Sequence, residues 1–204
     1  MARHDFERVI GLARAHGLIL FSDEVYRELE HYPASRLPAA CDEYERAVSL
    51  GSISKSYGLP GLRIGWIATR DAALREAVSL LKDYTTICAS APSEFLTALA
   101  LRNRRVLLDR NLAIVRRNLP LLDDFFDRNA ETFDWVRPTA SPIGFPRVRG
   151  ISDVAGYCAR LAEAGVLLLP GSVYDQPDHV RIGFGRANMP EALGLLEANL
   201  GDGG

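Results

Sequence analysis

The residues best suited to covalent chemistry lie in one glycine-rich segment, residues 51–65. It holds the amine of Lys55, the hydroxyls of Ser52 and Ser54, and the guanidinium of Arg63. Glycines at positions 58, 61 and 65 let the backbone turn sharply and approach a ligand closely. These groups together suit an anion that lies beside a reactive carbonyl. The plain alternative is a glycine-rich loop whose charges are solvated.

Lysine is scarce in this chain, which narrows the choice of a reactive amine. Of the 24 Lys and Arg residues, only Lys55 and Lys82 are lysines. Because arginine stays protonated in proteins, chemistry that needs a neutral amine must use one of these two.

Two other readings of the segment are weaker. It lacks the Gly-Lys-Ser/Thr sequence of a nucleotide-binding P-loop. Ser52-Ile-Ser-Lys55 matches the Ser-x-x-Lys of penicillin-binding acyl transferases, with Ser52 as the nucleophile. That family also needs Ser-Asp-Asn and Lys-Thr-Gly elements downstream, and neither occurs after residue 55. The acyl transferase hypothesis is therefore disfavoured.

The elements around these residues have the order of an α/β unit. Apolar residues at helical spacing predict a helix over 5–16, and short apolar runs predict strands over 18–21 and 47–53. Polar residues follow both strands, Asp23 after the first and Lys55 after the second. Ligands of such sheets collect at the carboxyl ends of parallel strands, so we expect these side chains to share one edge.

The rest of the chain predicts a further domain. A strand over 65–69 and helices over 72–82 and 93–102 complete the first part. A long helix over 105–126, bent or interrupted near Pro120, follows. Short strands and helices then alternate: strands over 135–136, 145–148, 166–169 and 180–184, and helices over 153–164 and 191–200. We expect part of a large domain over 1–103 and a smaller α+β domain over 104–204.

Three motifs now identify a family resemblance. The run Ser-x-Ser-Lys-x-x-Gly-x-x-Gly-x-Arg-x-Gly starts at Ser52, Asp23-Glu-Val-Tyr26 precedes it, and Val180-Arg-Ile-Gly-Phe-Gly185 follows it. Together they resemble the class I/II aminotransferases, fold type I enzymes that use pyridoxal phosphate. The resemblance implies an α/β fold with a parallel-rich sheet and covers nearly the whole chain.

The resemblance implies which residues bind the cofactor. They are Asp23, Tyr26, Ser52, Ser54, Lys55 and Arg63. Lys55 would form the Schiff base with the cofactor aldehyde and then carry the proton between substrate Cα and cofactor C4′. Asp23 would pair with the protonated pyridine nitrogen, and Tyr26 would donate a hydrogen bond to the phenolic oxygen of the ring. Ser52 and Arg63 would hold the phosphate. Taken singly, Asp23 suits a cap or turn and Tyr26 a packing role.

The substrate carboxylate has two candidate arginines near the end of the chain. Arg181 matches the family's carboxylate-binding arginine, and Arg186 lies five residues beyond it. Because an odd offset along a strand puts two side chains on opposite faces, only one of them should face the site. Val180, Ile182 and Phe184 would face the core and turn Arg181 the other way, so we favour Arg181.

The expected activity is transfer of an amino group between an amino acid and a 2-oxo acid. Alternatives are β-elimination, replacement or cyclisation of an amino acid, or a non-catalytic aminotransferase-like domain. Family members have roughly twice the 204 residues present here. We therefore expect the carboxyl-terminal half of an enzyme that is a homodimer when complete, and weak cofactor binding by this half alone.

Composition excludes other classes. The formal net charge is -2, so no overall basic field favours nucleic acid. The start lacks an apolar signal core and no long apolar run follows, so we expect a cytoplasmic protein without a membrane partner. The four histidines show no metal-ligand spacing, and the three cysteines are scattered without a Cys-x-x-Cys pair. We expect no metal site.

Overall fold

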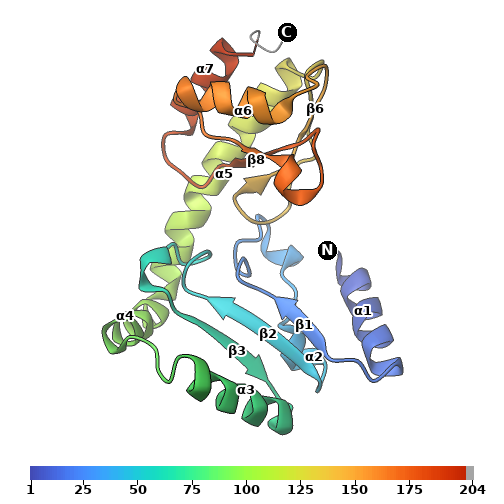
Figure 1. Cartoon of the computed structure of the whole chain (residues 1–204), viewed down its shortest axis with the longest axis vertical. Helices are drawn as coiled ribbons and strands as arrows, with labels where there is room; N and C mark the ends of the chain where they lie inside the picture. Colours follow the sequence, from blue (N-terminus) through green and yellow to red (C-terminus); the bar gives the residue numbers. More distant parts are fainter. Residues whose placement is uncertain (201–204) are drawn as a thin grey trace. The chain divides into compact units, whose positions relative to one another are not determined.

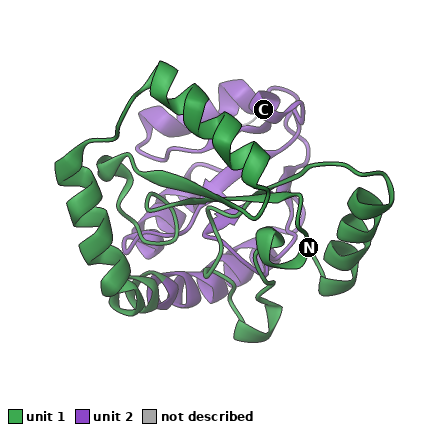
Figure 2. Cartoon of the chain, turned by 90° about the horizontal axis from the view of Figure 1, so that it is seen from below, with its two compact units in different colours: residues 1–111 green, residues 112–204 purple. Residues whose placement is uncertain are grey.

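The computed structural model of the chain describes residues 1–200. The chain divides into two compact units, residues 1–111 and residues 112–204 (Figure 2). The division falls inside the long helix α5 (Arg104–Arg128), whereas the expected domain boundary precedes this helix. The domain assignment at 103/104 stays a prediction for the whole protein.

The first unit is an α/β unit built around a short sheet (Figure 1). Its elements in chain order are α1 (Arg3–Ala15), β1 (Leu20–Asp23), η1 (Pro33–Ser35), α2 (Ala40–Glu43), β2 (Ala47–Ser52), η2 (Pro60–Leu62), β3 (Gly65–Thr69), α3 (Ala72–Thr85) and α4 (Ala91–Arg102). The sheet has the order β1-β2-β3, with β1 parallel and β3 antiparallel to β2. The predicted strand over 65–69 is confirmed, and the first predicted strand lies two residues later than expected.

Residues of α1 and α2 pack against the start of β2 on one face of this sheet. Phe6, Ile10 and Ala13 repeat at helical spacing on α1 and pack with Tyr44 and Ala47 in a small apolar core. The Tyr44 hydroxyl donates to the carbonyl of Leu18 at 2.8 Å, which ties the end of α2 to the chain that enters β1.

The register of the strands assigns side chains to the two faces. Ser49 pairs with Ser22 and Ala68, and Gly51 pairs with Trp66, so these residues share the face that contacts α2. A Cβ at Gly51 would collide with the Trp66 indole, which explains the glycine. Asp23, Leu50 and Ser52 lie on the opposite face, because successive side chains alternate along a strand.

The second unit has a continuous apolar core. Besides most of α5 it contains β4 (Phe133–Asp134), β5 (Ile143–Gly144), β6 (Arg147–Val148), α6 (Val154–Glu163), β7 (Leu169–Pro170), η3 (Gly171–Tyr174), β8 (Val180–Gly183) and α7 (Met189–Ala198). Strand β8 lies between β5 and β7 and is antiparallel to both. Phe125, Phe133, Tyr157, Phe184 and Leu196 belong to one buried cluster drawn from helices and strands alike.

Several sequence expectations need correction; among them, the strand expected over 166–169 lies at 169–170, and only 147–148 of the strand expected over 145–148 is a strand. The long helix is not interrupted near Pro120, because α5 continues through this residue. Pro120 lacks a backbone N–H, but one missing hydrogen bond does not end a helix whose side chains at Leu119 and Leu122 are buried. The strand expected at 135–136 lies at 133–134, where Phe133 is the buried residue. Trp135 instead stacks on Phe126 with ring centroids 4.4 Å apart.

Candidate active site

Asp23 stands at the carboxyl end of β1. It is the last residue of the strand, it pairs in register with Leu50 of β2, and its side chain is exposed. Its Oδ1 atom accepts a hydrogen bond from the Val25 backbone N–H at 3.1 Å, which starts the turn that carries Tyr26. The end of β1 therefore carries the Asp23 carboxylate, and the turn that follows carries the Tyr26 phenol three residues later.

Glu24 points to the other face and anchors this turn. Its Oε1 atom accepts from the Ala40 N–H at 2.8 Å and from the Ser49 hydroxyl at 2.7 Å. A hollow on that face is lined by Glu24, Ser49, Gly51 and Trp66 among others, but by neither Asp23 nor Lys55. Ser52, Ser56 and Tyr57 also line this hollow, so it adjoins the candidate site, which we place at the ends of β1 and β2 beside Asp23 and Lys55.

The loop after β2 carries the candidate serines and Lys55. The hydroxyls of Ser52 and Ser54 lie 2.6 Å apart, and the Ser54 backbone N–H donates to the Ser52 hydroxyl at 3.1 Å. The Gly58 N–H donates to the Lys55 carbonyl at 3.0 Å, which closes a turn that ends at a positive φ of 70°. That conformation favours glycine at position 58 and turns the chain back past Lys55.

Lys55 is exposed and lies beside Tyr26. The Lys55 Nζ atom is 5.8 Å from the centroid of the Tyr26 ring. Within the described residues, 1–200, no carboxylate lies within 4.0 Å of this amine. The other lysine, Lys82, lies on α3 and donates to the Thr86 hydroxyl at 3.1 Å. The structure thus brings Lys55 together with the turn that follows Asp23, as the sequence predicts for strand ends of one sheet.

Arg63 follows the loop at the start of the return to β3. It ends η2 in the left-handed region with a φ of 54°, and its Nη1 atom donates to the Pro60 carbonyl at 3.0 Å. The next residue, Ile64, accepts through its carbonyl from the Ser52 hydroxyl and from the Ile53 N–H, both at 3.2 Å. Arg63 therefore lies beside the Ser52 segment with most of its guanidinium free to bind an anion.

Three residues that sequence reasoning missed hold the Lys55 loop in place. The Ser56 side chain is 1% exposed, and its hydroxyl lies 3.0 Å from the Val25 carbonyl and 2.6 Å from the Arg27 carbonyl. Asn111 Nδ2 donates to the Ser56 carbonyl at 2.9 Å. The Tyr57 hydroxyl donates to Glu28 at 3.1 Å. No spacing in the sequence signals these contacts, because each joins segments far apart in the chain.

The phenol of Tyr57 is held in its protonated form. Burial, together with the adjacent Glu28 carboxylate, raises the pKa of Tyr57 to about 12. Burial disfavours the phenolate because it removes water from the charge, and the carboxylate repels it. Tyr57 therefore remains a hydrogen-bond donor at physiological pH.

Arg181 lies in the second unit, on β8. The flanking Val180 and Ile182 are buried and Arg181 is half-buried, so the predicted alternation is confirmed for these three residues. Arg186 is exposed in the loop after the strand. The Asn118 amide of α5 donates to the carbonyls of Phe184 and Arg186, at 2.9 and 2.6 Å, which fixes the path of that loop.

The donor set suits a phosphorylated aldehyde with a basic ring nitrogen. One carboxylate ends β1, paired hydroxyls lie at the end of β2, and the chain that follows these strands carries one amine beside one phenol and one guanidinium. Within residues 1–200, Lys55, Asp23 and Arg63 form no ion pairs, so their charges can interact with a ligand. The same part of the chain contains no cluster of three or more His, Cys, Asp or Glu side chains placed to hold a metal ion.

Comparison with known proteins points to one family. The model for aminotransferase class I and II matches residues 1–194. The chain is 32% identical over 187 residues to a capreomycidine synthase from Streptomyces vinaceus, covering 90% of this chain and 47% of that protein. Among solved structures, a PLP-dependent aminotransferase from Streptococcus suis 89-1591 superposes with a TM-score of 0.92 and 29% identity, over 100% of this chain and 54% of that one.

A second solved structure is similar to nearly the same extent. The PLP-dependent cyclase OrfR has a TM-score of 0.89 and 28% identity, over 99% of this chain and 55% of that one. The chain therefore spans about half the length of the relatives that it matches.

Proposed function

The chain belongs to the class I and II aminotransferase family, and from this premise we propose that it forms part of a pyridoxal phosphate-dependent enzyme that acts on an amino acid. We propose aminotransfer to a 2-oxo acid as its reaction. The observation that carries the proposal is the exposed Lys55 amine, 5.8 Å from the Tyr26 ring centroid, on the loop that follows β2.

The residues of the candidate site take distinct roles in this proposal. When bound, the cofactor supplies an electron-accepting ring that stabilises charge at substrate Cα. Lys55 would hold the cofactor through its Nζ atom, with water leaving from the aldehyde, and once the substrate amine displaces it the free Lys55 amine would take up the Cα proton. Asp23 would keep the ring nitrogen protonated, and Tyr26 would donate a hydrogen bond to the ring oxygen. Ser52, Ser54 and Arg63 would bind the phosphate through two hydroxyls and a planar guanidinium.

Two substitutions distinguish the proposed role of Asp23 in turnover from the proposed role of Arg63 in cofactor binding. In the whole protein, Asp23→Ala should keep bound cofactor and lose turnover, because the ring nitrogen loses its counter-ion. Arg63→Ala should mainly raise the dissociation constant for pyridoxal phosphate. Titration of the visible cofactor band, with steady-state kinetics beside it, measures both quantities. The same defect in both variants would refute this division of roles.

Arg181 is proposed to bind the substrate carboxylate through two parallel hydrogen bonds. A half-buried guanidinium on a strand whose neighbours are buried is well placed for such a contact. Arg181→Ala should lower kcat/KM by about a hundredfold or more, since a charged hydrogen-bonded contact is lost. Arg186→Ala, at an exposed loop position, should have far less effect. The reverse ranking would exchange the two assignments.

Cyclisation of an amino acid is the second candidate function. It is favoured by the similarity to the PLP-dependent cyclase, whose TM-score of 0.89 is close to the 0.92 of the aminotransferase. The same amine, carboxylate and guanidinium set serves both reactions, since each begins with removal of a proton beside the substrate amino group. The residues described above therefore do not choose between them.

One experiment separates the two candidates. The whole protein, loaded with pyridoxal phosphate, is incubated with a panel of amino acids in the presence and absence of a 2-oxo acid, and products are resolved by mass. Aminotransfer consumes the 2-oxo acid and yields its amino acid. Cyclisation consumes the first amino acid alone. A Lys55→Ala variant is the control, and turnover by that variant would contradict the proposed role of Lys55.

A homodimer, amino acid and 2-oxo acid substrates, and a cytoplasmic location complete the proposal as expectations from family membership. Among residues 1–200 no helix combines the length and the apolar character that crossing a membrane requires.

A further inference from the structure

The turn after β1 and the Lys55 loop are joined by contacts that nothing in the family motifs assigns. The Tyr57 hydroxyl donates to Glu28 Oε2 at 3.1 Å, across 29 positions of the chain. Ser56 contributes the second link, through the carbonyls of Val25 and Arg27. Tyr26 lies between the carbonyls that Ser56 contacts, and Lys55 precedes Ser56. Both links therefore attach the chain directly after Lys55 to the turn that contains Tyr26.

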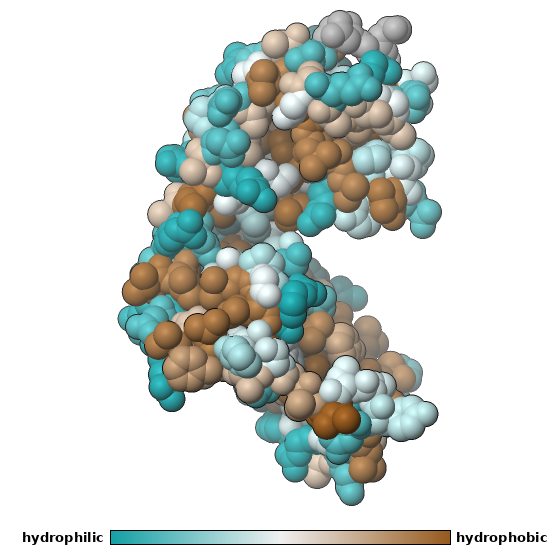
Figure 3. Space-filling view, turned by 60° about the vertical axis from the view of Figure 1, so that its left-hand side comes forward, coloured by the Kyte–Doolittle hydropathy of each residue, from teal (hydrophilic) through white to brown (hydrophobic). Residues whose placement is uncertain are grey.

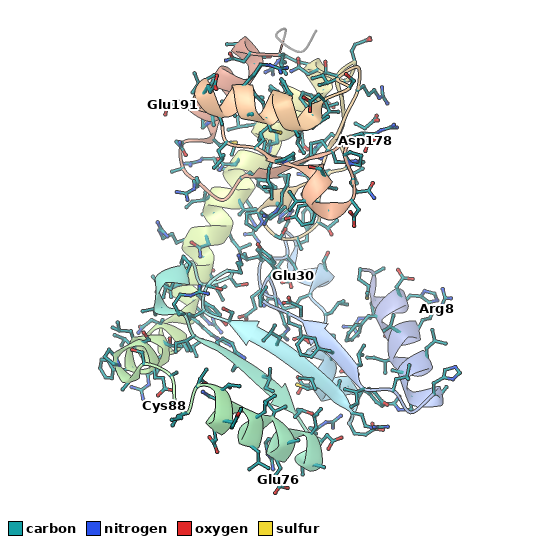
Figure 4. All side chains as sticks on the ribbon, viewed as in Figure 1. Arg8, Glu30, Glu76, Cys88, Asp178 and Glu191 are labelled. Atoms are coloured by element: carbon teal, nitrogen blue, oxygen red, sulfur yellow. The ribbon has the colours of Figure 1, made fainter. Side chains whose placement is uncertain are left out.

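The backbone conformation of Glu28 and its contacts with Glu30 and Arg36 fix the position of its carboxylate. Its φ is 75°, a left-handed conformation that is uncommon for a residue with a side chain. The Glu28 N–H donates to Glu30 Oε1 at 3.1 Å, and Glu30 in turn pairs with Arg36 at 2.9 Å. Figure 4 shows Glu30 just beyond the carboxyl end of β1. Arg36 also lies 3.6 Å from Glu28 Oε1, whose side chain is only 13% exposed.

We propose that the hydrogen bond from Tyr57 to Glu28 positions the Lys55 amine beside Tyr26, so that Tyr57 and Glu28 are positioning residues for cofactor binding. The inference rests on the proposed function, because it assumes that Lys55 binds the cofactor. It goes beyond that function in assigning a role to two residues that touch neither cofactor nor substrate.

The geometry gives the reason. Lys55 is exposed and has a long flexible side chain, so the contact of its amine with the Tyr26 ring depends on where the loop places the Lys55 backbone. Two adjacent residues, Ser56 and Tyr57, attach that backbone to the 25–28 turn. Ser56 is buried and contacts two backbone carbonyls, so its substitution would alter packing as well as hydrogen bonding. The Tyr57 hydroxyl can be removed alone.

The test compares label on the two lysines of the chain. Each variant is equilibrated with pyridoxal phosphate and reduced with borohydride, and the pyridoxyl adducts on Lys55 and Lys82 are counted by peptide mapping. Tyr57→Phe keeps the ring and removes the hydroxyl, so the ratio of Lys55 to Lys82 adduct should fall about tenfold, as expected for the loss of one hydrogen bond to a charged group. The melting temperature should stay close to that of the unsubstituted chain.

Substitutions at Glu28 test whether the acceptor of this hydrogen bond has the same effect as its donor. Glu28→Ala should lower the ratio as Tyr57→Phe does, whereas Glu28→Gln keeps an acceptor oxygen and should restore most of it. The double variant, Tyr57→Phe with Glu28→Ala, should fall no further than Glu28→Ala alone, which already removes this hydrogen bond together with the ion pair to Arg36. Tyr32→Phe, at a tyrosine that is 56% exposed, is the matched control and should leave the ratio unchanged.

The outcomes separate this inference from the proposed function. An unchanged ratio in Tyr57→Phe, or additive losses in the double variant, would overturn the positioning role and leave Lys55 as the cofactor residue. Absence of Lys55 adduct in the unsubstituted whole protein would overturn both.

Discussion

The two compact units differ in how completely each buries its own apolar side chains. Within residues 112–200, helices α5, α6 and α7 and the short strands share one buried cluster that includes Phe125, Tyr157 and Phe184. Within residues 1–111, the corresponding cluster consists of a few residues between α1, α2 and β2. The unit with the candidate cofactor residues is therefore the one with the smaller core.

The surface of the first unit shows the same difference. Helix α3 buries none of its residues and α4 buries only Thr97. Phe95 is 71% exposed and Tyr84 is 90% exposed. Figure 3 shows apolar side chains gathered on the face of residues 1–111 that carries α4. Soluble monomers rarely expose large contiguous apolar patches, so this surface is one that a partner or a further segment of chain should cover.

Apolar burial is therefore concentrated in the second unit, whose large buried cluster supports the strand that carries Arg181. The first places exposed, charged groups at the ends of β1 and β2 and relies on hydrogen bonds across loops to hold them. Substitutions in the second unit should therefore mainly lower the free energy of unfolding, and substitutions in the first should mainly change ligand binding or association.

The largest expected effect is loss of a core aromatic in the second unit. Phe125 is fully buried and packs edge-on against Phe126, with ring centroids 5.2 Å apart. Phe125→Ala should lower the free energy of unfolding by about 3–5 kcal/mol, because a cavity replaces the ring. Phe95→Ala, at an exposed position on α4, should change it by about 0.5 kcal/mol or less. Urea unfolding measures both, and equal losses would break the comparison.

The two tryptophans allow each unit to be followed separately. Trp66 lies on β3 of the first unit, and Trp135 stacks on Phe126 in the second. With Trp135→Phe, fluorescence reports on the first unit; with Trp66→Phe, it reports on the second. We expect the first unit to unfold at a urea concentration lower by about 1 M, since it buries less apolar area. Coincident midpoints would show a single cooperative unit instead.

Self-association should depend on the apolar face of the first unit. Phe95 and Leu99 lie four residues apart on α4, on the same side of the helix, and both are exposed. Changing both to Glu should reduce binding of a hydrophobic dye and reduce light scattering at high protein concentration. Leu167→Glu, at a leucine of the second unit that is 87% exposed, is the control and should have less effect. An equal effect would contradict the assignment of the patch to the first unit.

The smallest expected effect is loss of a surface ion pair in the second unit. Arg128 of α5 contacts both carboxylate oxygens of Glu197 on α7, at 3.1 and 3.2 Å, but the two side chains are 57% and 44% exposed. Arg128→Ala should lower the free energy of unfolding by about 0.2–1 kcal/mol. A loss as large as that of Phe125→Ala would mean that charge, and not apolar burial, stabilises this unit.

The sequence predicts much of the fold because its local patterns are strong. The β3 strand and the helices α3, α4 and α5 follow from apolar periodicity, with ends displaced by a few residues. The wrong expectations arise where tertiary packing decides. Pro120 suggested a break, but buried leucines on both sides keep α5 helical. Trp135 suggested a strand, but its indole is used for stacking on Phe126.

In the candidate site, too, local motifs are predictable from the sequence and contacts between distant segments are not. Asp23, Tyr26, Ser52, Lys55 and Arg63 lie in two short motifs, so the resemblance of these motifs to the family is enough to propose them together. Contacts such as Tyr57 with Glu28 and Asn111 with Ser56 join residues 29 and 55 positions apart. A single sequence holds no pattern that pairs them, because their proximity is a product of the folded chain.

The central claim is that Lys55 is the residue that binds the cofactor, and the scarcity of lysine makes the test direct. The protein is equilibrated with pyridoxal phosphate, reduced with borohydride, digested, and mapped by mass spectrometry for pyridoxyl-lysine. The account predicts the adduct on Lys55, beside Tyr26, and little on Lys82, which lies on α3 and donates to Thr86. An adduct on Lys82 with none on Lys55 would contradict it.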